Sequence, residues 1–172
     1  MIENLWTQSN QGIAAWKTVP VPDVILHIVG HYHLKARLEM ARMESLAEQA
    51  VLLEGAEHPV LVQLRDEIWR FCRDFRTHMT LEERTLFPYL LDPGAGARGR
   101  GGLVPPVVKL LEDEHQAETD LFQRLLVLSD ACPPAAGARS LRRRLNRSLA
   151  AMEKALHRHI LLETQVLFRR IL

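Results

Sequence analysis

The sequence predicts an all-α protein, an up-down-up-down four-helix bundle. Three observations support this fold class. Apolar residues recur at the spacing of an amphipathic helix along most of the 172 residues. Three breaks rich in glycine or proline divide the chain into four long helical segments, and short connections favour antiparallel neighbours. No segment of the sequence shows the alternation or the β-branched enrichment of a strand.

Turn signals set the expected bounds of each element. Residues 1–22 form a lead-in that ends at Pro22, and Asp23 is the expected N-cap of the first helix. Gly55 ends that helix and Pro59 begins the second, in which Pro88 should kink the last turn. The expected helices cover residues 23–53, 59–91, 105–129 and 139–172. The expected domain organisation is the lead-in, 1–22, followed by one helical domain, 23–172.

Composition and charge argue against several classes of protein. With 47% hydrophobic and 25% charged residues, the chain has the make-up of an ordinary globular domain. The net charge of +1 gives no electrostatic reason to bind nucleic acid or a membrane surface. No apolar run approaches the roughly 18 residues that span a bilayer, and no secretory signal pattern is visible. Two cysteines, Cys72 and Cys132, do not make a disulfide framework, so we expect reduced thiols and a cytoplasmic location.

One motif occurs near the ends of the second and fourth helices. The pattern H-x3-E-x3-L-F begins at His78 and again at His159. A further histidine lies upstream of each copy, His33 at 45 residues before His78 and His115 at 44 residues before His159. The chain therefore consists of two helical hairpins that each carry H…H-x3-E, which is typical of one structural unit used twice.

Helix geometry places these polar residues on the core-facing stripes of their helices. Positions four apart share one side of a helix, so Glu82 lies with His78 and Glu163 lies with His159. The stripe of the first helix that holds His33 also holds Leu26, Val29, Ala36, Met40, Ala47 and Val51. At about 1.5 Å per residue, all these polar residues lie near the same end of an alternating bundle. We therefore expect one buried layer made of His33, His78, Glu82, His115, His159 and Glu163.

The same geometry turns neighbouring polar residues away from this layer. Glu83 lies roughly 140° round the helix from His78, and His157 lies roughly 160° from His159. We interpret four histidines as non-ligands with solvent or structural roles: His27, His31, His58 and His157. Glu118 faces inward beside His115, where it could orient a ligand, line an entry path or simply lie at the bundle surface. A basic run is expected to be a solvated helix face, although it could hold an acidic partner or phosphate: Arg139, Arg142, Arg143, Arg144 and Arg147.

A pair of metal ions is the best explanation of the layer. One histidine on an apolar face is commonly a satisfied core residue, but two carboxylates buried without cations would cost several kcal/mol each. Six ligands exceed what one tetrahedral zinc takes. Two ions, each with two histidines and sharing both glutamates, fit the count, and an oxo or hydroxo bridge would leave an open position on each. This set favours two non-haem iron ions and leaves manganese or a mixed pair open.

The order of the ligands also separates families of bundles. Ferritin-like di-iron bundles use Glu-x-x-His, whereas this chain has His-x-x-x-Glu twice. The chain thereby resembles the hemerythrin-like (HHE cation-binding) superfamily, and within it the di-iron domain of the RIC proteins, for repair of iron centres. The resemblance covers residues 23–172. The stretches that carry it are HIVGHYH from His27, HMTLEERTLFP from His78, EDEH from Glu112 and HILLETQVLF from His159.

Three features depart from relatives within this superfamily. Oxygen-carrying hemerythrins place a second histidine four residues after the histidine of the third helix, where this chain has Thr119. They also end their motif in aspartate, where this chain has Glu163. RIC proteins commonly carry an N-terminal cysteine-bearing domain, whereas the first cysteine here is Cys72. A five-histidine oxygen-carrier site is therefore not expected.

The resemblance implies a non-haem di-iron protein of the response to nitrosative or oxidative stress. Its function would be iron–sulfur cluster repair or the handling of nitric oxide, and its partners O2, NO or a damaged iron–sulfur protein. The alternative is a module that binds or senses O2 or NO without turnover. A metal-free interaction bundle is a third interpretation. The residues leave open whether the protein is an enzyme, which substrate it meets and how it oligomerises.

Overall fold

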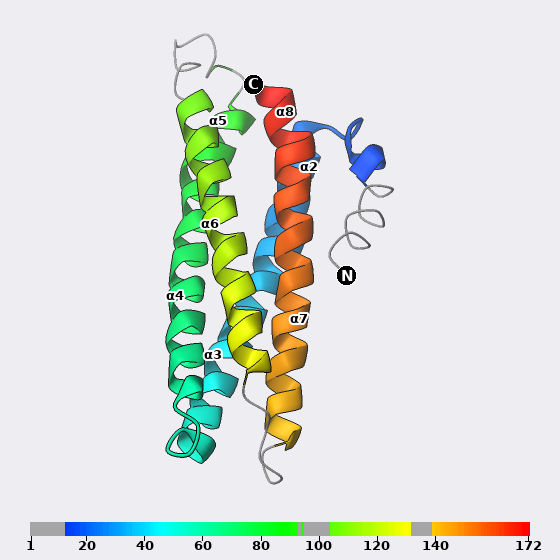
Figure 1. Cartoon of the computed structure of the whole chain (residues 1–172). Helices are drawn as coiled ribbons and strands as arrows, with labels where there is room; N and C mark the ends of the chain where they lie inside the picture. The colour runs from blue at the N-terminus through cyan, green and yellow to red at the C-terminus, as the bar shows by residue number, and fades with distance from the viewer. Residues whose placement is uncertain (1–12, 93, 95–103, 132–138) are drawn as a thin grey trace.

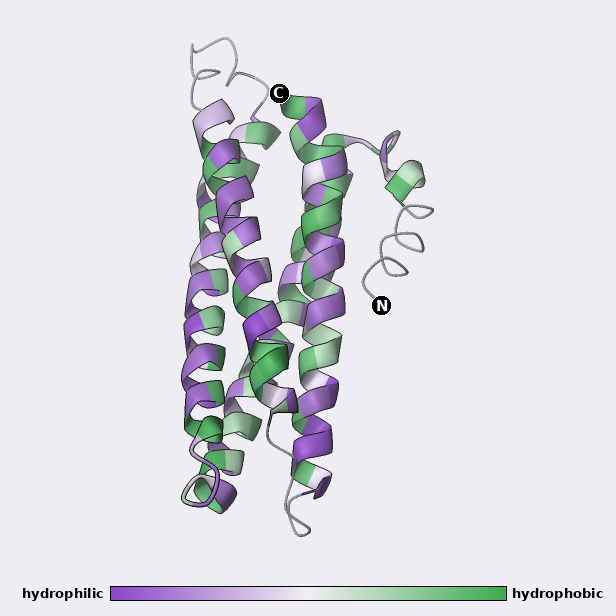
Figure 2. Cartoon of the chain, in the orientation of Figure 1, coloured by the Kyte–Doolittle hydropathy of each residue, from purple (hydrophilic) through white to green (hydrophobic). Residues whose placement is uncertain are grey.

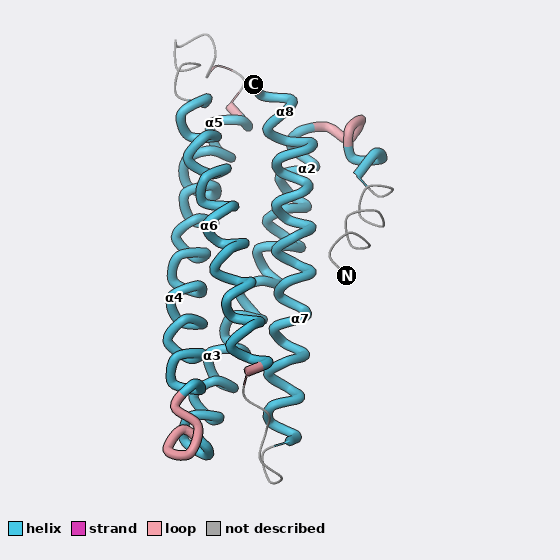
Figure 3. Tube along the Cα trace, viewed as in Figure 1, coloured by secondary structure: helices cyan, strands magenta, loops and turns pink. Residues whose placement is uncertain are grey.

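The computed structural model describes residues 13–92, 94, 104–131 and 139–172. They form the expected up-down-up-down bundle of four long helices (Figure 1). No strand occurs within these ranges (Figure 3). Most of the lead-in and of the two predicted breaks after the second and third helices lies outside the described residues, as does Cys132.

Three of the four long helices contain a short π-helical segment. The first helix comprises α2 (Val21–His27), the π segment η1 (Ile28–His33) and α3 (Leu34–Glu54). The second comprises α4 (Val60–Leu81), the π segment η2 (Glu82–Leu86) and α5 (Phe87–Leu91). The third is the uninterrupted α6 (Val104–Asp130). The fourth comprises α7 (Arg139–Leu162), the π segment η5 (Glu163–Leu167) and α8 (Phe168–Ile171).

The helices pack around a square. Helix α3 contacts α4 and α7, and α6 contacts α4 and α7 on the other side. The beginning of α2 and the ends of the second and fourth helices lie at the same end of the bundle (Figure 1). Because the first and third helices start at this end while the other two finish there, residues early in one pair lie level with residues late in the other.

The core consists of two hydrophobic clusters with the polar layer between them. One cluster, in the far half of the bundle, includes the stacked rings of Phe71 and Phe75. The other lies at the end near the C-terminus and includes Phe87 and Phe168. On each helix one predicted ligand falls between these clusters in sequence, namely His33, Glu82, His115 and His159. Figure 2 shows the hydrophilic residues of α4 on its outward side and the hydrophobic ones facing the bundle.

The π segment η1 corrects the predicted core face of the first helix. Leu26 was expected beside His33 but is 68% exposed, whereas Val24 and Ile28 are fully buried. A π-helical turn holds more residues than an α turn. The residues before it are therefore rotated relative to those after it, and a stripe drawn at constant α spacing fails there. Beyond η1 the prediction holds, because Ala36, Met40 and Ala47 are buried.

The helix bounds and single residues show smaller differences. Helix α2 begins at Val21, so Asp23 lies in its first turn and does not act as the N-cap. Pro88 lies in α5, and the departure from α geometry is the π segment just before it. In the basic run, Arg142 is only 2% exposed and donates from Nη2 to the carbonyl oxygen of Ser129 at 3.2 Å, so this residue is not part of a solvated face. Cys72 is buried, as expected of a small core residue.

Candidate metal centre

The structure brings the six predicted residues together in one buried cluster, which we call the histidine–glutamate cluster. Its members are His33, His78, Glu82, His115, His159 and Glu163, and each is between 0% and 3% exposed. They form two overlapping groups whose ligand atoms lie within 4.8 Å of one another. The first group is His33, Glu82, His159 and Glu163, and the second is His78, Glu82, His115 and Glu163. Both glutamates belong to both groups, as two bridging carboxylates would.

The imidazole Nε2 atoms point into the middle of the cluster. Nε2 of His33 lies 3.2 Å from Nε2 of His159. Oε2 of Glu82 lies 3.3 Å from Nε2 of His33, 3.5 Å from that of His78 and 3.7 Å from that of His159. Four atoms able to donate electron pairs therefore surround one small volume, which is the arrangement that a cation requires.

The second glutamate, Glu163, contacts one histidine of each group. Oε1 of Glu163 lies 2.6 Å from Nε2 of His159, and Oε2 lies 3.1 Å from Nε2 of His115. The two oxygens of this carboxylate thus face histidines of different groups. A carboxylate placed in this way can bind two cations at once.

Unsatisfied polar atoms provide a test of whether cations fit. Six buried side-chain atoms of the cluster have no hydrogen-bond partner: Nε2 of His78, both carboxylate oxygens of Glu82, both ring nitrogens of His115 and Oε2 of Glu163. Buried polar atoms are nearly always hydrogen-bonded, so such a concentration of unpaired polar atoms needs an explanation. Nitrogen and carboxylate donors are those that iron and similar transition metals prefer. The cluster therefore fits metal ions.

Carboxylates outside the cluster orient two of its histidines. Nδ1 of His33 lies 2.6 Å from Oε1 of Glu83, and Nδ1 of His78 lies 3.0 Å from Oε2 of Glu114. When Nδ1–H donates to a carboxylate, Nε2 carries the free electron pair and the ring is held in position. Glu118, which the sequence placed inward, is buried with Oε1 at 3.6 Å from the same Nδ1 of His78.

The prediction that Glu83 is turned away from the ligand layer did not include its contact with His33. Its carboxylate is outside the histidine–glutamate cluster, as its angle from His78 implied, but it reaches across to the first helix. Arg37 donates to both oxygens of Glu83 at 2.9 Å and so fixes this carboxylate against His33. Glu114 was missed as well. Its position directly before His115 was the only available signal, and that position does not show that it would face His78.

The electrostatics show how the cluster balances charge without a cation. Burial disfavours the charged form of His78, but the hydrogen bond to Glu114 and the nearby carboxylates of Glu82 and Glu118 outweigh it and raise the pKa of His78 to about 11. Burial likewise opposes protonation of His159, yet the carboxylates of Glu163 and Glu82 raise its pKa to about 9. Burial raises the pKa of Glu118 to about 8. Protons therefore supply the positive charge that a metal would otherwise bring, and metal binding must displace them.

The π segments position half of the cluster. His33 is the last residue of η1, Glu82 the first of η2 and Glu163 the first of η5. Short π-helical turns are frequent at functional sites because they change the direction of a side chain without ending the helix. The third helix, α6, has no π segment and presents His115 from regular α geometry.

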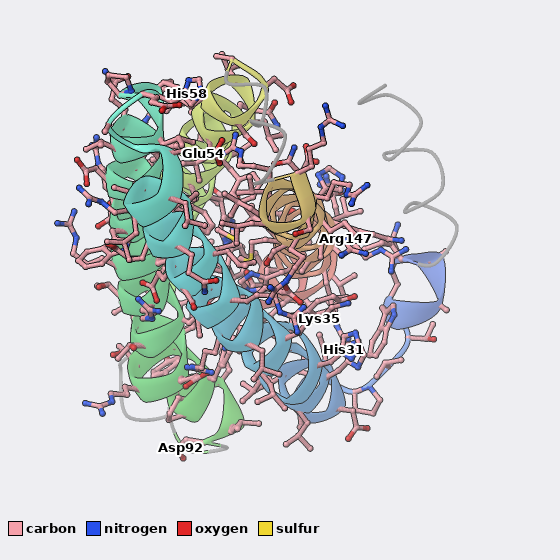
Figure 4. All side chains as sticks on the ribbon, turned by 90° about the horizontal axis from the view of Figure 1, so that it is seen from below. His31, Lys35, Glu54, His58, Asp92 and Arg147 are labelled. Carbon is pink, nitrogen blue, oxygen red and sulfur yellow. The ribbon has the colours of Figure 1, made fainter. Side chains whose placement is uncertain are left out.

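The remaining histidines lie outside both groups, as expected. His27 and His31 stack on each other with ring centroids 5.1 Å apart. His31 and Lys35 project from the first helix on the side where the lead-in helix lies, and His58 lies in the connection before α4 (Figure 4). Thr119, at the position of the additional hemerythrin histidine, donates its hydroxyl to the carbonyl oxygen of His115 at 2.8 Å.

Fold and site together define a helical bundle that binds metal cations between its helices. The chain belongs to the hemerythrin HHE cation-binding domain family, whose model matches residues 24–171. No helix among the described residues combines the length and apolar character needed to cross a membrane.

Relatives named as iron-sulfur cluster repair proteins are similar along nearly the whole chain. The iron-sulfur cluster repair protein YtfE of Edwardsiella ictaluri is 27% identical over 157 residues, which cover 91% of this chain and 68% of the relative. ScdA of Staphylococcus haemolyticus, also an iron-sulfur cluster repair protein, is 27% identical over 94% of this chain and 72% of its own length. DnrN of Neisseria gonorrhoeae, another such repair protein, is 28% identical over 92% of this chain and 96% of its own length.

Proposed function

We propose that the histidine–glutamate cluster holds two non-haem iron ions, and that this centre serves the repair of iron–sulfur clusters under nitrosative or oxidative stress. The observation that carries the proposal is the pair of buried glutamates shared between two histidine groups. The relatives named as iron-sulfur cluster repair proteins support the same role. The partner is then a damaged iron–sulfur protein, and the place of action is the cytoplasm.

The roles of the residues follow from the geometry. His33 and His159 would hold one ion and His78 and His115 the other, with Glu82 and Glu163 bridging both. When bound, the iron pair supplies labile ferrous iron and an open position for O2 or NO. Glu83 and Glu114 hold the imidazoles of His33 and His78 in the orientation that presents Nε2. The two hydrophobic clusters exclude water from the layer on both sides.

The first experiment measures metal content after anaerobic purification, together with the visible spectrum. We expect about two irons per chain and oxo-to-iron absorption, in keeping with shared carboxylate ligands. Glu82→Gln and Glu163→Gln should lower occupancy, because a neutral amide bridges two cations poorly. Glu112→Gln is the matched control, since Glu112 is an exposed residue of α6. Well under one metal per chain would instead favour a metal-free interaction bundle.

The second experiment separates repair from sensing. Iron-loaded protein is incubated with an enzyme whose iron–sulfur cluster has been damaged by nitric oxide, and recovery is compared with the same amount of free ferrous iron. Faster recovery supports repair, and equal recovery contradicts it. A stable and reversible NO adduct of the diferrous protein, with no net consumption of NO, would favour a sensing module.

A further inference from the structure

Four aromatic side chains pack against the imidazoles of the histidine–glutamate cluster. Three of the neighbouring rings are phenylalanines: Phe75 at 5.6 Å from His159, Phe87 at 6.0 Å from His33 and Phe168 at 5.9 Å from His115, measured between ring centroids. The fourth is Tyr32, whose ring stacks on His159 at 6.4 Å with 27° between the planes. A phenol gives up an electron far more easily than a benzene ring does. Of these four neighbours, only Tyr32 can therefore be oxidised under mild conditions.

Further rings continue from Tyr32 towards the surface. The edge of Tyr32 meets His27 at 5.3 Å, and His27 meets the indole of Trp16 at 4.3 Å. His31 also packs against Tyr32, at 5.0 Å. Trp16 is half-buried and lies in the short helical turn of the lead-in, outside the bundle proper (Figure 1). An unbroken series of ring contacts therefore links the ligand His159 to an easily oxidised indole at the edge of the molecule.

The burial of the centre makes such a connection useful. All six members of the histidine–glutamate cluster are at most 3% exposed, so large soluble reductants cannot touch the ions. A centre that meets peroxide while it holds too few electrons must take one from the nearest oxidisable side chain. Without a route for electrons from the surface, the oxidised side chain would remain beside the ligands and damage them.

We propose that Tyr32 and Trp16 form a relay that carries oxidising equivalents from the centre to the protein surface. This inference rests on the proposed iron pair. It adds a protective function to the repair function. In it, the chain's own aromatic residues supply the electron that peroxide needs when the centre holds too few. The ring of His27 bridges the two oxidisable residues and is not itself oxidised.

The electron balance of the relay closes with hydrogen peroxide as the oxidant and a small thiol as the final reductant. Peroxide takes two electrons and two protons to form two waters. When only one ferrous ion is present, it gives one electron, and Tyr32 gives the second electron and one proton, while the other proton comes from solvent. Trp16 then returns an electron and its indole proton to Tyr32. The neutral indolyl radical takes a hydrogen atom from the thiol, and two thiyl radicals combine to a disulfide.

The test uses iron-loaded full-length protein, reduced to the one-ferrous level, treated with hydrogen peroxide in the presence of a nitroso spin trap. Mass spectrometry then locates the trapped adducts, and electron paramagnetic resonance records the radical. We expect adducts at Trp16. Tyr32→Phe keeps the ring but removes the oxidisable hydroxyl, so it should abolish the Trp16 adduct. Trp16→Phe should move the adduct to Tyr32. Tyr89→Phe, which changes a half-buried tyrosine of α5, should leave the Trp16 adduct unchanged.

Several results would overturn the relay. Equal Trp16 labelling in the Tyr32→Phe variant would show that peroxide reaches the indole directly. Equal labelling of Trp69, which is 52% exposed and remote in sequence from this series, would show general surface oxidation. Should Tyr32→Phe fail to load iron, the Trp16→Phe variant decides, because Trp16 lies outside the ligand layer. A chain that binds iron but gives no adduct loses the relay alone, whereas a chain that binds no iron loses the proposed function too.

Discussion

The carboxylates beside the centre differ in what each of them touches. Glu82 and Glu163 face only imidazole nitrogens within the cluster, whereas Glu83 faces a histidine on one side and Arg37 on the other. A carboxylate whose charge is already neutralised by a guanidinium attracts a metal ion less strongly, but it still accepts a hydrogen bond from Nδ1–H. Glu83 is therefore suited to orient His33 and not to bind the metal itself.

This assignment predicts a partial effect for Glu83→Gln. The amide loses the ion pair with Arg37 and accepts less strongly from Nδ1 of His33, so the imidazole is held less firmly. We expect iron affinity to fall by about 10- to 100-fold, the range typical of such supporting partners. Competition with a coloured ferrous chelator measures this affinity. The control is Glu112→Gln, and an unchanged affinity in Glu83→Gln would show that Arg37 and Glu83 form only a surface pair.

Cys72 gives a second prediction at the scale of one residue. Its side chain is buried, and burial raises the pKa of the thiol to about 12, so almost no thiolate exists at neutral pH. The thiolate is the reactive form. In a Cys132→Ser variant, which leaves Cys72 as the single thiol, we expect no reaction with an aromatic disulfide reagent in the native state and full reaction in denaturant. Rapid native labelling would contradict the buried position.

The residues of the centre were predictable to different degrees for a physical reason. Four members of the cluster, His78 with Glu82 and His159 with Glu163, follow from the i to i+4 relation, which helix geometry fixes. His33 and His115 follow from their place along the helix and on its apolar stripe. Glu83 and Glu114 act on histidines of other helices. Their contacts depend on the rotation and separation of packed helices, and the spacing along one helix does not encode these.

At the scale of helices, the π segments explain where sequence reasoning failed. The number and bounds of the helices were confirmed to within a few residues, since glycine and proline mark their ends. The side of α2 that faces the core was wrong, as Leu26 shows. No residue pattern in this chain predicts a π-helical turn. Such a turn is stabilised by tertiary contacts and by the functional site at which it lies.

Two glycines provide a matched prediction for single helices. A Cβ at Gly55, just after α3, would lie 2.5 Å from the carbonyl oxygen of Val51, so Gly55→Ala should destabilise by about 1–3 kcal/mol through this overlap. A Cβ at Gly30, within η1, would meet no atom within 4 Å. Gly30→Ala should therefore stabilise by about 0.5–1 kcal/mol, because alanine loses less chain entropy on folding. Urea unfolding of the metal-free variants measures both changes in the free energy of unfolding. Changes of the same sign in the two variants would contradict the described packing.

On the scale of the whole molecule, the charges are distributed unevenly. Arginines of α3 and α4 form ion pairs, for example Arg76 with Glu44 and Arg37 with Glu83. On α7, Arg143 and Arg147 are exposed, and neither forms an ion pair with a described residue. Exposed pairs add little to stability. The fold is therefore stabilised mainly by the two hydrophobic clusters. Between them, it is stabilised by the protons or metal cations that neutralise the buried glutamates.

Removing the metal should make the stability of the whole bundle sensitive to pH. In the metal-free protein, carboxylate neighbours outweigh burial and raise the pKa of His159 from 6.5 to about 9 and that of His78 to about 11. A raised histidine pKa stabilises the folded state fully below the unfolded value, and this contribution is lost as pH rises through the folded value. We expect the melting temperature of chelator-treated protein to fall from pH 6.5 upwards, through about 9.

The iron-loaded protein is the comparison for this experiment. A bound cation takes over the role of the protons, so its melting temperature should change less over the same pH range. Free iron at about 100 times its dissociation constant should add about 2.7 kcal/mol to the stability. Calorimetry of both forms at matched pH measures the difference. Parallel pH profiles would show that the cluster's protonation does not contribute to folding.

The π segment η1 also limits which changes in chain length the protein can tolerate. Deleting one residue here, such as Gly30, would restore α geometry without rotating α2, because the π turn holds one residue more than the α turn that would replace it. Ile25 and Ile28, which are buried, would then lie about seven and four residues before His33, on its side of a regular α helix. The lead-in, which contacts His27 through Trp16, would stay on the side of the bundle on which it packs. We therefore expect single-residue deletions among relatives to fall within residues 28–33 in preference to α3, where each would rotate His33 away from the other five residues of the cluster.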